Sequence, residues 1–148
     1  MRAHDEIRQI ARSRGWTVAD RWRARLAGWI GRRALAAEEG LCLLPCNAIH
    51  TFGMRVPIDV VFVDRRLRVV RCVAGLPPRR LALAWRAVAV VELPAGAAAE
   101  AGLRPGVHLS RARPVTDLVT GPATATDAAG PDDAPPFTER FRNQKSYP

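Results

Sequence analysis

The sequence predicts a mainly β protein: a compact antiparallel β-barrel or sandwich of about five or six short strands, with an N-terminal helix and one short helix before the last strand. Short apolar runs rich in β-branched residues recur between residues 41 and 110. Proline and glycine separate these runs, which is typical of turns. Closing such short strands into a barrel would hide their edges.

The N-terminal part of the chain predicts two helices. Residues 2–13 form at best a marginal helix, because Ile7 and Ile10 are its only large apolar residues. Residues 20–30 predict a firmer helix, capped by Asp20, whose apolar face is formed by Trp22, Leu26, Trp29 and Ile30.

The middle of the chain predicts strands and turns. The runs 58–63 and 67–73 indicate a β-hairpin turning at 64–66, and residues 75–78 are expected to form a loop. Further segments complete the prediction: an apolar run at 41–44, a long strand at 85–93, a short helix over 94–101 ended by Gly102, and a last strand at 107–110.

Length and composition fit one soluble globular domain. The chain has 148 residues, of which 48% are hydrophobic and 25% charged. No apolar run approaches the ~18 residues of a membrane-spanning helix, and the charged start lacks the apolar stretch of a signal peptide. We therefore expect a cytoplasmic monomer. The expected organisation is a basic N-terminal extension (1–18), a β domain (19–113) and a disordered tail (114–148) rich in proline, alanine and aspartate.

The basic charge predicts an attraction to polyanions. The net charge is +9, and arginine provides nearly all of the positive charge. Aromatic residues among arginines can bind nucleic acid or an anionic membrane surface. The candidate residues for this role are Arg21, Arg23, Arg25, Arg32 and Arg33. Alternatively, these arginines are solvated, the tryptophan face covers the sheet, and the arginine content reflects base composition in the source genome.

A polar cluster within apolar sequence predicts a binding site. Strand alternation places Asp59 on the same face as Val61 and Val63, so its carboxylate needs partners if it is buried. His50 and Arg55 on the preceding segment are the expected partners. The candidate ligand-binding residues are therefore His50, Thr51, Arg55 and Asp59. The alternatives are a structural carboxylate that accepts turn N–H groups, and a catalytic His–Asp pair.

The cysteines indicate a metal site, but less strongly than the polar cluster indicates a binding site. Cys42, Cys46 and His50 follow a C-x3-C-x3-H spacing, but a zinc site needs four ligands and no second close pair follows. Free cysteines more often pack as small hydrophobic residues. An odd count of three, with Cys72, also argues against a disulfide framework. We expect no cofactor, and the sequence provides no catalytic residue and no common hydrolase or nucleotide-binding motif.

Four segments resemble the DUF192 family of small prokaryotic proteins: RLAGWIGR (25–32), PCNAIHTFGMRVPIDVVFVD (45–64), GLPPRR (75–80) and VVELPAGAAAEAGLRPGVHL (90–109). The resemblance covers roughly residues 19–110 and implies a small barrel-like domain of uncharacterised function. Some relatives lie near pilus or secretion genes. The chain departs from the family pattern at Arg66-Leu67, where Asp-Gly is common, and at Val107, where Asp is frequent.

Together these observations favour a non-enzymatic module that binds a small ligand or a protein partner near His50 and Asp59. The resemblance adds the expectation of an accessory role in a pilus or secretion system. A polyanion-binding module and a metal-dependent enzyme are the alternatives.

Overall fold

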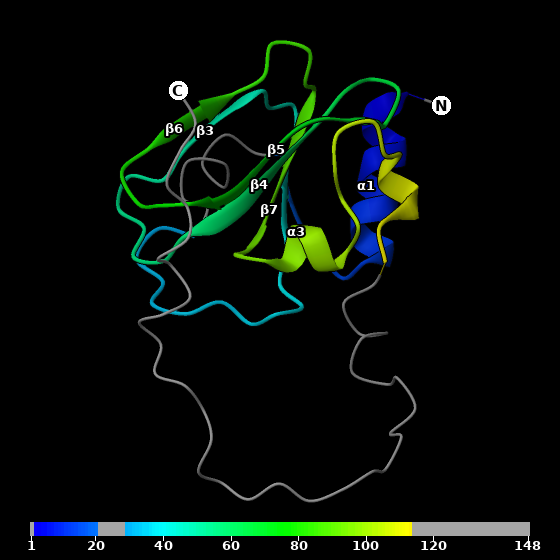
Figure 1. Cartoon of the computed structure of the whole chain (residues 1–148). Helices are drawn as coiled ribbons and strands as arrows, with labels where there is room; N and C mark the ends of the chain where they lie inside the picture. The colour runs from blue at the N-terminus through cyan, green and yellow to red at the C-terminus, as the bar shows by residue number, and fades with distance from the viewer. Residues whose placement is uncertain (1, 21–28, 114–148) are drawn as a thin grey trace, which may run out of the picture.

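The computed structural model describes residues 2–20 and 29–113 of the chain (Figure 1). This part is mainly β and contains two sheets, which confirms the mainly β class but not the predicted barrel or sandwich. The larger sheet consists, in spatial order, of β1 (Thr17–Ala19), β2 (Leu41–Leu43), β7 (Ala89–Pro94), β4 (Ile58–Val63) and β5 (Val69–Leu76). The smaller sheet pairs β3 (Ala48–His50) with β6 (Leu81–Leu83).

Within the described residues the larger sheet does not close into a barrel, because β1 and β5 form its two edges. Its strands are antiparallel except for β1 and β2, which run parallel. The helical elements are α1 (Ala3–Ser13), the short α3 (Ala97–Glu100) and the 3-10 turn η1 (Leu109–Arg111). The fold is thus an open sheet with helical elements and a second small sheet around it.

Each face of the larger sheet is covered by a separate hydrophobic cluster. On one face, α1, α3 and η1 pack over β4 and β7 through residues such as Ile7, Ala98 and Leu109. On the other face, β3 and β6 contribute Ile49 and Ala82 to a cluster that contains Trp29, Met54, Val60 and Phe62. All six residues of β4 are therefore buried. This explains why its sequence is nearly continuously apolar.

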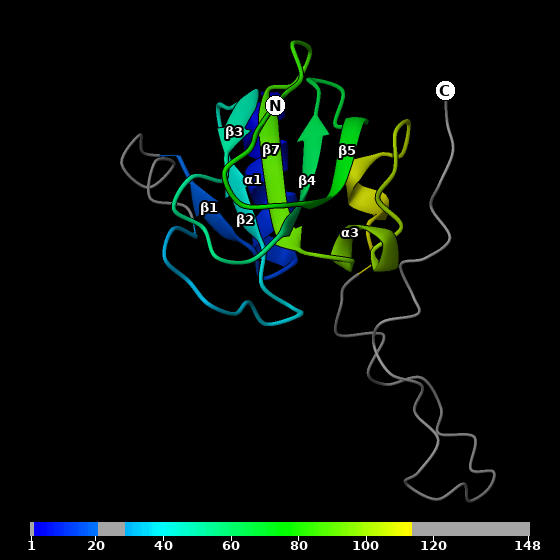
Figure 2. The same cartoon turned by 60° about the vertical axis from the view of Figure 1, so that its left-hand side comes forward.

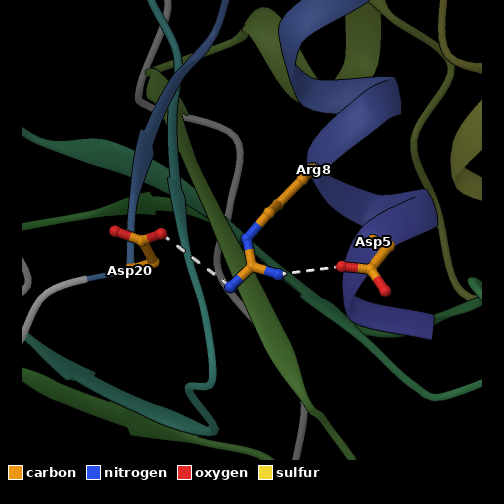
Figure 3. Close-up of polar contacts among 3 residues, drawn as sticks. All are labelled: Asp5, Arg8 and Asp20. Carbon is orange, nitrogen blue, oxygen red and sulfur yellow. Dashed lines mark hydrogen bonds and ion pairs between the residues drawn. The ribbon is translucent and has the colours of Figure 1, made fainter. Parts of the chain in front are cut away.

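Helix α1 lies against the sheet rather than outside the domain (Figure 2). The expected helix is present, and Ile7 and Ala11, four residues apart, are completely buried. Arg8 holds the helix near the end of β1, because its guanidinium lies 3.2 Å from Asp5 and 3.8 Å from Asp20 (Figure 3). Residues 3–19, which we expected to lie largely in an extension, contribute to the same core as the sheet.

The predicted β4–β5 hairpin is confirmed, although its turn lacks Asp-Gly. Asp64 Oδ1 accepts hydrogen bonds from the backbone N–H groups of Arg66 (2.8 Å) and Arg68 (3.0 Å). Leu67 adopts a φ of 58°, a left-handed conformation that glycine takes more easily. The side chain of Leu67 is buried, so packing offsets the backbone strain.

Several predicted boundaries were wrong, and β5, predicted at 67–73, covers Val69–Leu76 and so includes the start of the loop expected at 75–78. The strand expected at 85–93 begins only at Ala89, because residues 84–87 form a turn closed by the Ala87 N–H on the Ala84 carbonyl (2.9 Å). The expected strand at 107–110 is a single bridge between Arg68 and His108 followed by η1. The helix expected over 94–101 covers only Ala97–Glu100, since Gly96 precedes it in a left-handed conformation (φ 94°). The C-terminal cap is confirmed at Gly102 (φ 71°).

The short strands β1, β3 and β6 were not predicted. Each has three residues, too few for a clear alternating pattern. The helix expected at 20–30 falls mainly on residues 21–28, and these, like the expected disordered tail at 114–148, lie outside the described residues.

Candidate functional site

Asp59 is buried in the middle of the fold, and both oxygens of its carboxylate accept hydrogen bonds from backbone N–H groups. Its side chain is on the α3 side of β4, and the residue is 1% exposed. Oδ1 accepts from the N–H of Gly75 (2.8 Å), and Oδ2 accepts from the N–H groups of Gly96 (2.9 Å) and Ala98 (3.0 Å). These bonds join β5 and the start of α3 to β4. The predicted need for partners is thus met by backbone amides.

Thr51 is also completely buried and connects two loops. Its hydroxyl donates to the Pro77 carbonyl (2.7 Å) and accepts from the Arg80 N–H (2.9 Å). Its own N–H donates to the Arg80 carbonyl (2.9 Å), and its carbonyl accepts from the Arg79 N–H (3.0 Å). These four bonds fix the segment that leads into β6 against the end of β3. Arg79 is held there with a φ of 63°.

His50 and Arg55 occupy different surroundings from Asp59. His50 ends β3 opposite Leu81, and its Nδ1 accepts from the N–H of Phe52 (3.2 Å). The rings of His50 and Phe52 lie 5.7 Å apart. Arg55 is exposed. The structure therefore connects His50, Phe52 and Thr51 to the β3–β6 sheet, whereas the hydrogen bonds of Asp59 lead to β5 and α3.

The outward side of the smaller sheet exposes large apolar side chains. Leu81 is 71% exposed and Leu83 41%, whereas Ala82 between them is buried in the core. Trp85, in the turn that follows β6, is 84% exposed, and Phe52 is 49% exposed. We call the four residues Phe52, Leu81, Leu83 and Trp85, together with His50, the β3–β6 outer face.

Exposed arginines lie close in the sequence to the residues of the β3–β6 outer face, and acidic residues are absent from the segment that contains Leu81, Leu83 and Trp85. Between residues 65 and 91 the chain has seven arginines and no aspartate or glutamate. The exposed arginines nearest to the face in the sequence are Arg55, Arg79, Arg80 and Arg86. None of them forms an ion pair within residues 2–20 and 29–113. The segments that form the face therefore contain both exposed apolar side chains and exposed arginines without an ion pair among the described residues.

Glu92 is a buried acid that the sequence analysis did not single out. It lies on β7, opposite Leu41 on β2 and Val60 on β4, and is 4% exposed. Its Oε2 is buried without a hydrogen-bond partner among the described residues. Burial raises the pKa of Glu92 to about 7. The sequence does contain a pattern that indicates this buried acid, because Glu92 is the only charged residue in the apolar run 87–93.

The candidate metal ligands do not form one cluster in the described part of the chain. Cys42 is completely buried in the cluster under α1, where desolvation raises the pKa of its thiol to about 12. Cys46 packs against the cluster on the opposite face, and its thiol donates to the Ala48 carbonyl (3.1 Å). Burial also raises the pKa of Cys72. These surroundings agree with packed thiols, and the raised pKa values of Cys42 and Cys72 leave these two residues with little of the reactive thiolate at neutral pH.

Of the candidate polyanion-binding residues, Arg21, Arg23 and Arg25 lie outside the described residues. Arg32 and Arg33 are exposed, and Arg32 lies 2.8 Å from Glu39. The hydrogen bond from Arg32 lowers the pKa of Glu39. Trp29 is buried in the cluster under β3 and β6. Among the described helices, none has the length and apolar character needed to cross a bilayer.

Comparison with known proteins identifies relatives without an established activity. Residues 6–111 match the model of a family described as an uncharacterised ACR. A solved structure of a protein of unknown function from Novosphingobium aromaticivorans DSM 12444 is similar, with 28% identity and a TM-score of 0.56, over 62% of this chain and 70% of that chain. A "putative transcription regulator" from Sinorhizobium meliloti 1021 has the same TM-score at 19% identity, over 62% and 76%. No curated protein matches significantly.

Proposed function

The chain belongs to the DUF192 family, and from that premise we propose that it is a non-enzymatic binding module that holds a protein partner against the β3–β6 outer face. The observation that carries this proposal is the exposure of Leu81 (71%), on a sheet whose other side is anchored in the core, and of Trp85 (84%), in the turn that follows β6. Contiguous exposed apolar side chains on a folded domain mark a surface that another molecule covers.

The residue types on this face favour a protein partner. Tryptophan and arginine provide much of the binding energy at protein interfaces, and aromatic residues are enriched there. The face is also rigid, because Thr51 fixes both the end of β3 and the entry to β6 with four hydrogen bonds. A preorganised surface loses less entropy on binding. Peripheral membrane binding more often uses a surface amphipathic helix, and the apolar side of α1 is buried here.

The charge around the face indicates the chemistry of the partner. Arg55, Arg79, Arg80 and Arg86 are exposed beside the apolar residues. A guanidinium group binds carboxylates through two parallel hydrogen bonds. We therefore propose a partner segment with apolar side chains flanked by aspartate or glutamate. A second copy of this chain fits poorly, because a symmetric contact would bring these arginines against each other.

Asp59 and Thr51 have supporting roles in this proposal. Their hydrogen-bonding groups are used by backbone partners, so they position the surface rather than contact the partner. Of the four residues expected to bind a ligand, His50 and Arg55 remain available for direct contact. No reaction is required by this arrangement, and the proposed function is binding alone.

Selection from a random peptide library on the immobilised full-length protein tests the proposal. We expect the enriched peptides to combine apolar residues with Asp or Glu. A synthesised representative should bind the Trp85→Ala and Leu81→Ser variants about tenfold more weakly than the wild type. Arg86→Glu should also weaken binding, whereas Arg104→Glu, the same charge change outside the face, should not. Thermal unfolding establishes that each variant is folded.

Two results would overturn this function. One is that the selected peptides bind Trp85→Ala and Leu81→Ser as tightly as the wild type. The other is that the protein sediments with vesicles of anionic phosphatidylglycerol, but not with neutral phosphatidylcholine vesicles, in a manner that depends on Trp85. The second result would assign the face to a lipid surface.

A further inference from the structure

Two basic segments that are distant in the sequence meet beside η1, away from the β3–β6 outer face. The β4–β5 turn provides Arg65, Arg66 and Arg68, and residues 104–113 contain three more arginines and His108 but no acid. The two segments are joined by a β-bridge between Arg68 and His108. The backbone N–H of Leu109 also donates to the Leu67 carbonyl (2.7 Å), and that of Val69 donates to the Val107 carbonyl (2.9 Å).

A cleft of about 520 Å³ lies at this junction. It is lined by Arg68, Gly106, Val107, His108 and Arg111. The lining therefore contains two guanidinium groups and an imidazole but no carboxylate. Asp64, the nearest acid in the sequence, uses its Oδ1 for the N–H groups of Arg66 and Arg68.

The hydrogen bonds of the lining residues leave donors available to a ligand. Arg68 uses Nη1 to donate to the Gly106 carbonyl (3.0 Å), which fixes the guanidinium at the cleft. The Nδ1 of His108 lies 2.8 Å from the Ser110 hydroxyl and accepts from the Ser110 N–H (3.4 Å). A neutral His108 therefore carries its ring proton on Nε2. Arg111 has no ion pair or side-chain hydrogen bond among the described residues.

A further arginine adds positive charge beside the cleft. Arg14, at the end of α1, donates from Nη2 to the Ser110 carbonyl (2.7 Å). Its Nη1 is buried and has no partner within the described ranges. Arg14, Arg68 and Arg111 form no ion pair with a carboxylate in the described part of the chain, and a bound anion would reduce the repulsion between them.

We propose that this cleft binds the phosphoryl group of a small phosphorylated molecule. Guanidinium groups match the geometry of phosphate oxygens, and an imidazole N–H provides a third donor. The volume of the cleft is in the range of small-molecule sites, and its lining mixes backbone with converging polar groups. This concave shape favours a small ligand over the backbone of a nucleic acid. The inference is independent of the β3–β6 outer face.

Isothermal titration of the full-length protein with pyrophosphate, in a phosphate-free buffer of low ionic strength, tests the inference. We expect saturable binding to one site and about tenfold weaker binding to Arg111→Ala, which loses charge-assisted hydrogen bonds. Arg104→Ala removes the same charge from the same segment but not from the cleft lining, so it should bind pyrophosphate within about twofold of the wild type. Both substitutions affect exposed side chains, and thermal unfolding verifies that the fold is retained.

A parallel titration with a nucleoside monophosphate and with a short DNA duplex distinguishes the sources of the phosphoryl group. Binding of the nucleoside monophosphate that competes with pyrophosphate supports the proposal. Three results would overturn it: no saturable binding of pyrophosphate, equal effects of Arg111→Ala and Arg104→Ala, or DNA binding that depends on Arg111 without binding of either small ligand.

Discussion

Asp59 and Glu92 lie one register position apart on neighbouring strands but on opposite faces of the sheet. Both oxygens of the Asp59 carboxylate accept backbone hydrogen bonds, whereas one oxygen of Glu92 has no hydrogen-bond partner among the described residues. Asp59 pairs with Leu93 across the β4–β7 ladder, and Val60 pairs with Glu92. Three backbone N–H groups surround the Asp59 carboxylate, whereas Glu92 Oε2 has no hydrogen-bond partner in the described residues. The same sheet thus contains one acid whose carboxylate accepts three backbone hydrogen bonds and one acid, Glu92, whose pKa is raised by burial.

Replacing Asp59 by asparagine should destabilise the protein by about 3 kcal/mol, because the amide NH2 group would face an N–H donor and charge-assisted hydrogen bonds would be lost. Urea unfolding measures this effect. Asp64→Asn is the matched control: Asp64 also accepts two backbone N–H groups, but in a more exposed turn, so about 1 kcal/mol is expected. Equal losses for the two variants would contradict the structural role of Asp59.

Because of Glu92, the free energy of unfolding should decrease as the pH rises. Its pKa is about 7 in the folded protein, above the ordinary value of 4.5. Between these two pH values the folded state therefore binds more protons than the unfolded state. The contribution of Glu92 to the free energy of unfolding is fully present below pH 4.5 and is lost as the pH rises through 7. The expected loss between pH 5 and pH 8 is about 3 kcal/mol.

Urea unfolding of the wild type and of Glu92→Gln at both pH values checks this prediction. The glutamine variant should lose much less stability over the same interval, because it has no proton to release. Glu39→Gln serves as an exposed control and should retain the pH dependence of the wild type. A wild-type stability that is constant from pH 5 to pH 8 would disagree with a protonated Glu92.

Thr51→Val should loosen the entry to β6, because valine keeps the shape of threonine but removes the hydroxyl that bonds Pro77 and Arg80. We expect a loss of about 2 kcal/mol in the free energy of unfolding. Amide hydrogen exchange at residues 79–83 should become faster. Thr51→Ser retains the hydroxyl and should preserve slow exchange; if both variants exchange alike, the hydroxyl does not hold these loops together.

Ile7→Ala tests whether α1 belongs to the folded domain. Ile7 is completely buried under the sheet, so the substitution should cost about 2–4 kcal/mol. Ile30→Ala removes the same atoms from a side chain that is 46% exposed, and a smaller loss is expected. Thermal or urea unfolding compares the two variants. Similar small losses for both would indicate that the domain is stable without the helix, as expected for an extension ending at residue 18.

The predictions that succeeded depended on local patterns with strong physical causes. The β-branched run of β4 and the paired run of β5 indicated a hairpin, and Gly102 indicated the end of a short helix. The predictions that failed concerned short segments. Trp85 was assigned to a strand because it continues an apolar run, yet it lies in an exposed turn.

The candidate site was predicted only in part. The position of Asp59 on a face shared with apolar residues followed from alternation along one strand, and so did its need for hydrogen-bond partners if it is buried; the structure shows that it is buried. The identity of the donors did not follow, because Gly75, Gly96 and Ala98 are 16, 37 and 39 residues away in the sequence. His50 and Arg55 were expected as partners on sequence proximity alone.

The sequence by itself determined the family, the mainly β class and the need of Asp59 for partners if it is buried, since each of these depends on residue types and spacing along the chain. Only the tertiary structure decided which amides surround that carboxylate, that Leu81 and Trp85 face outward, and that Arg68 meets His108. The reason is physical: these features are set by contacts between segments that fold together from distant positions, and no local periodicity encodes such contacts.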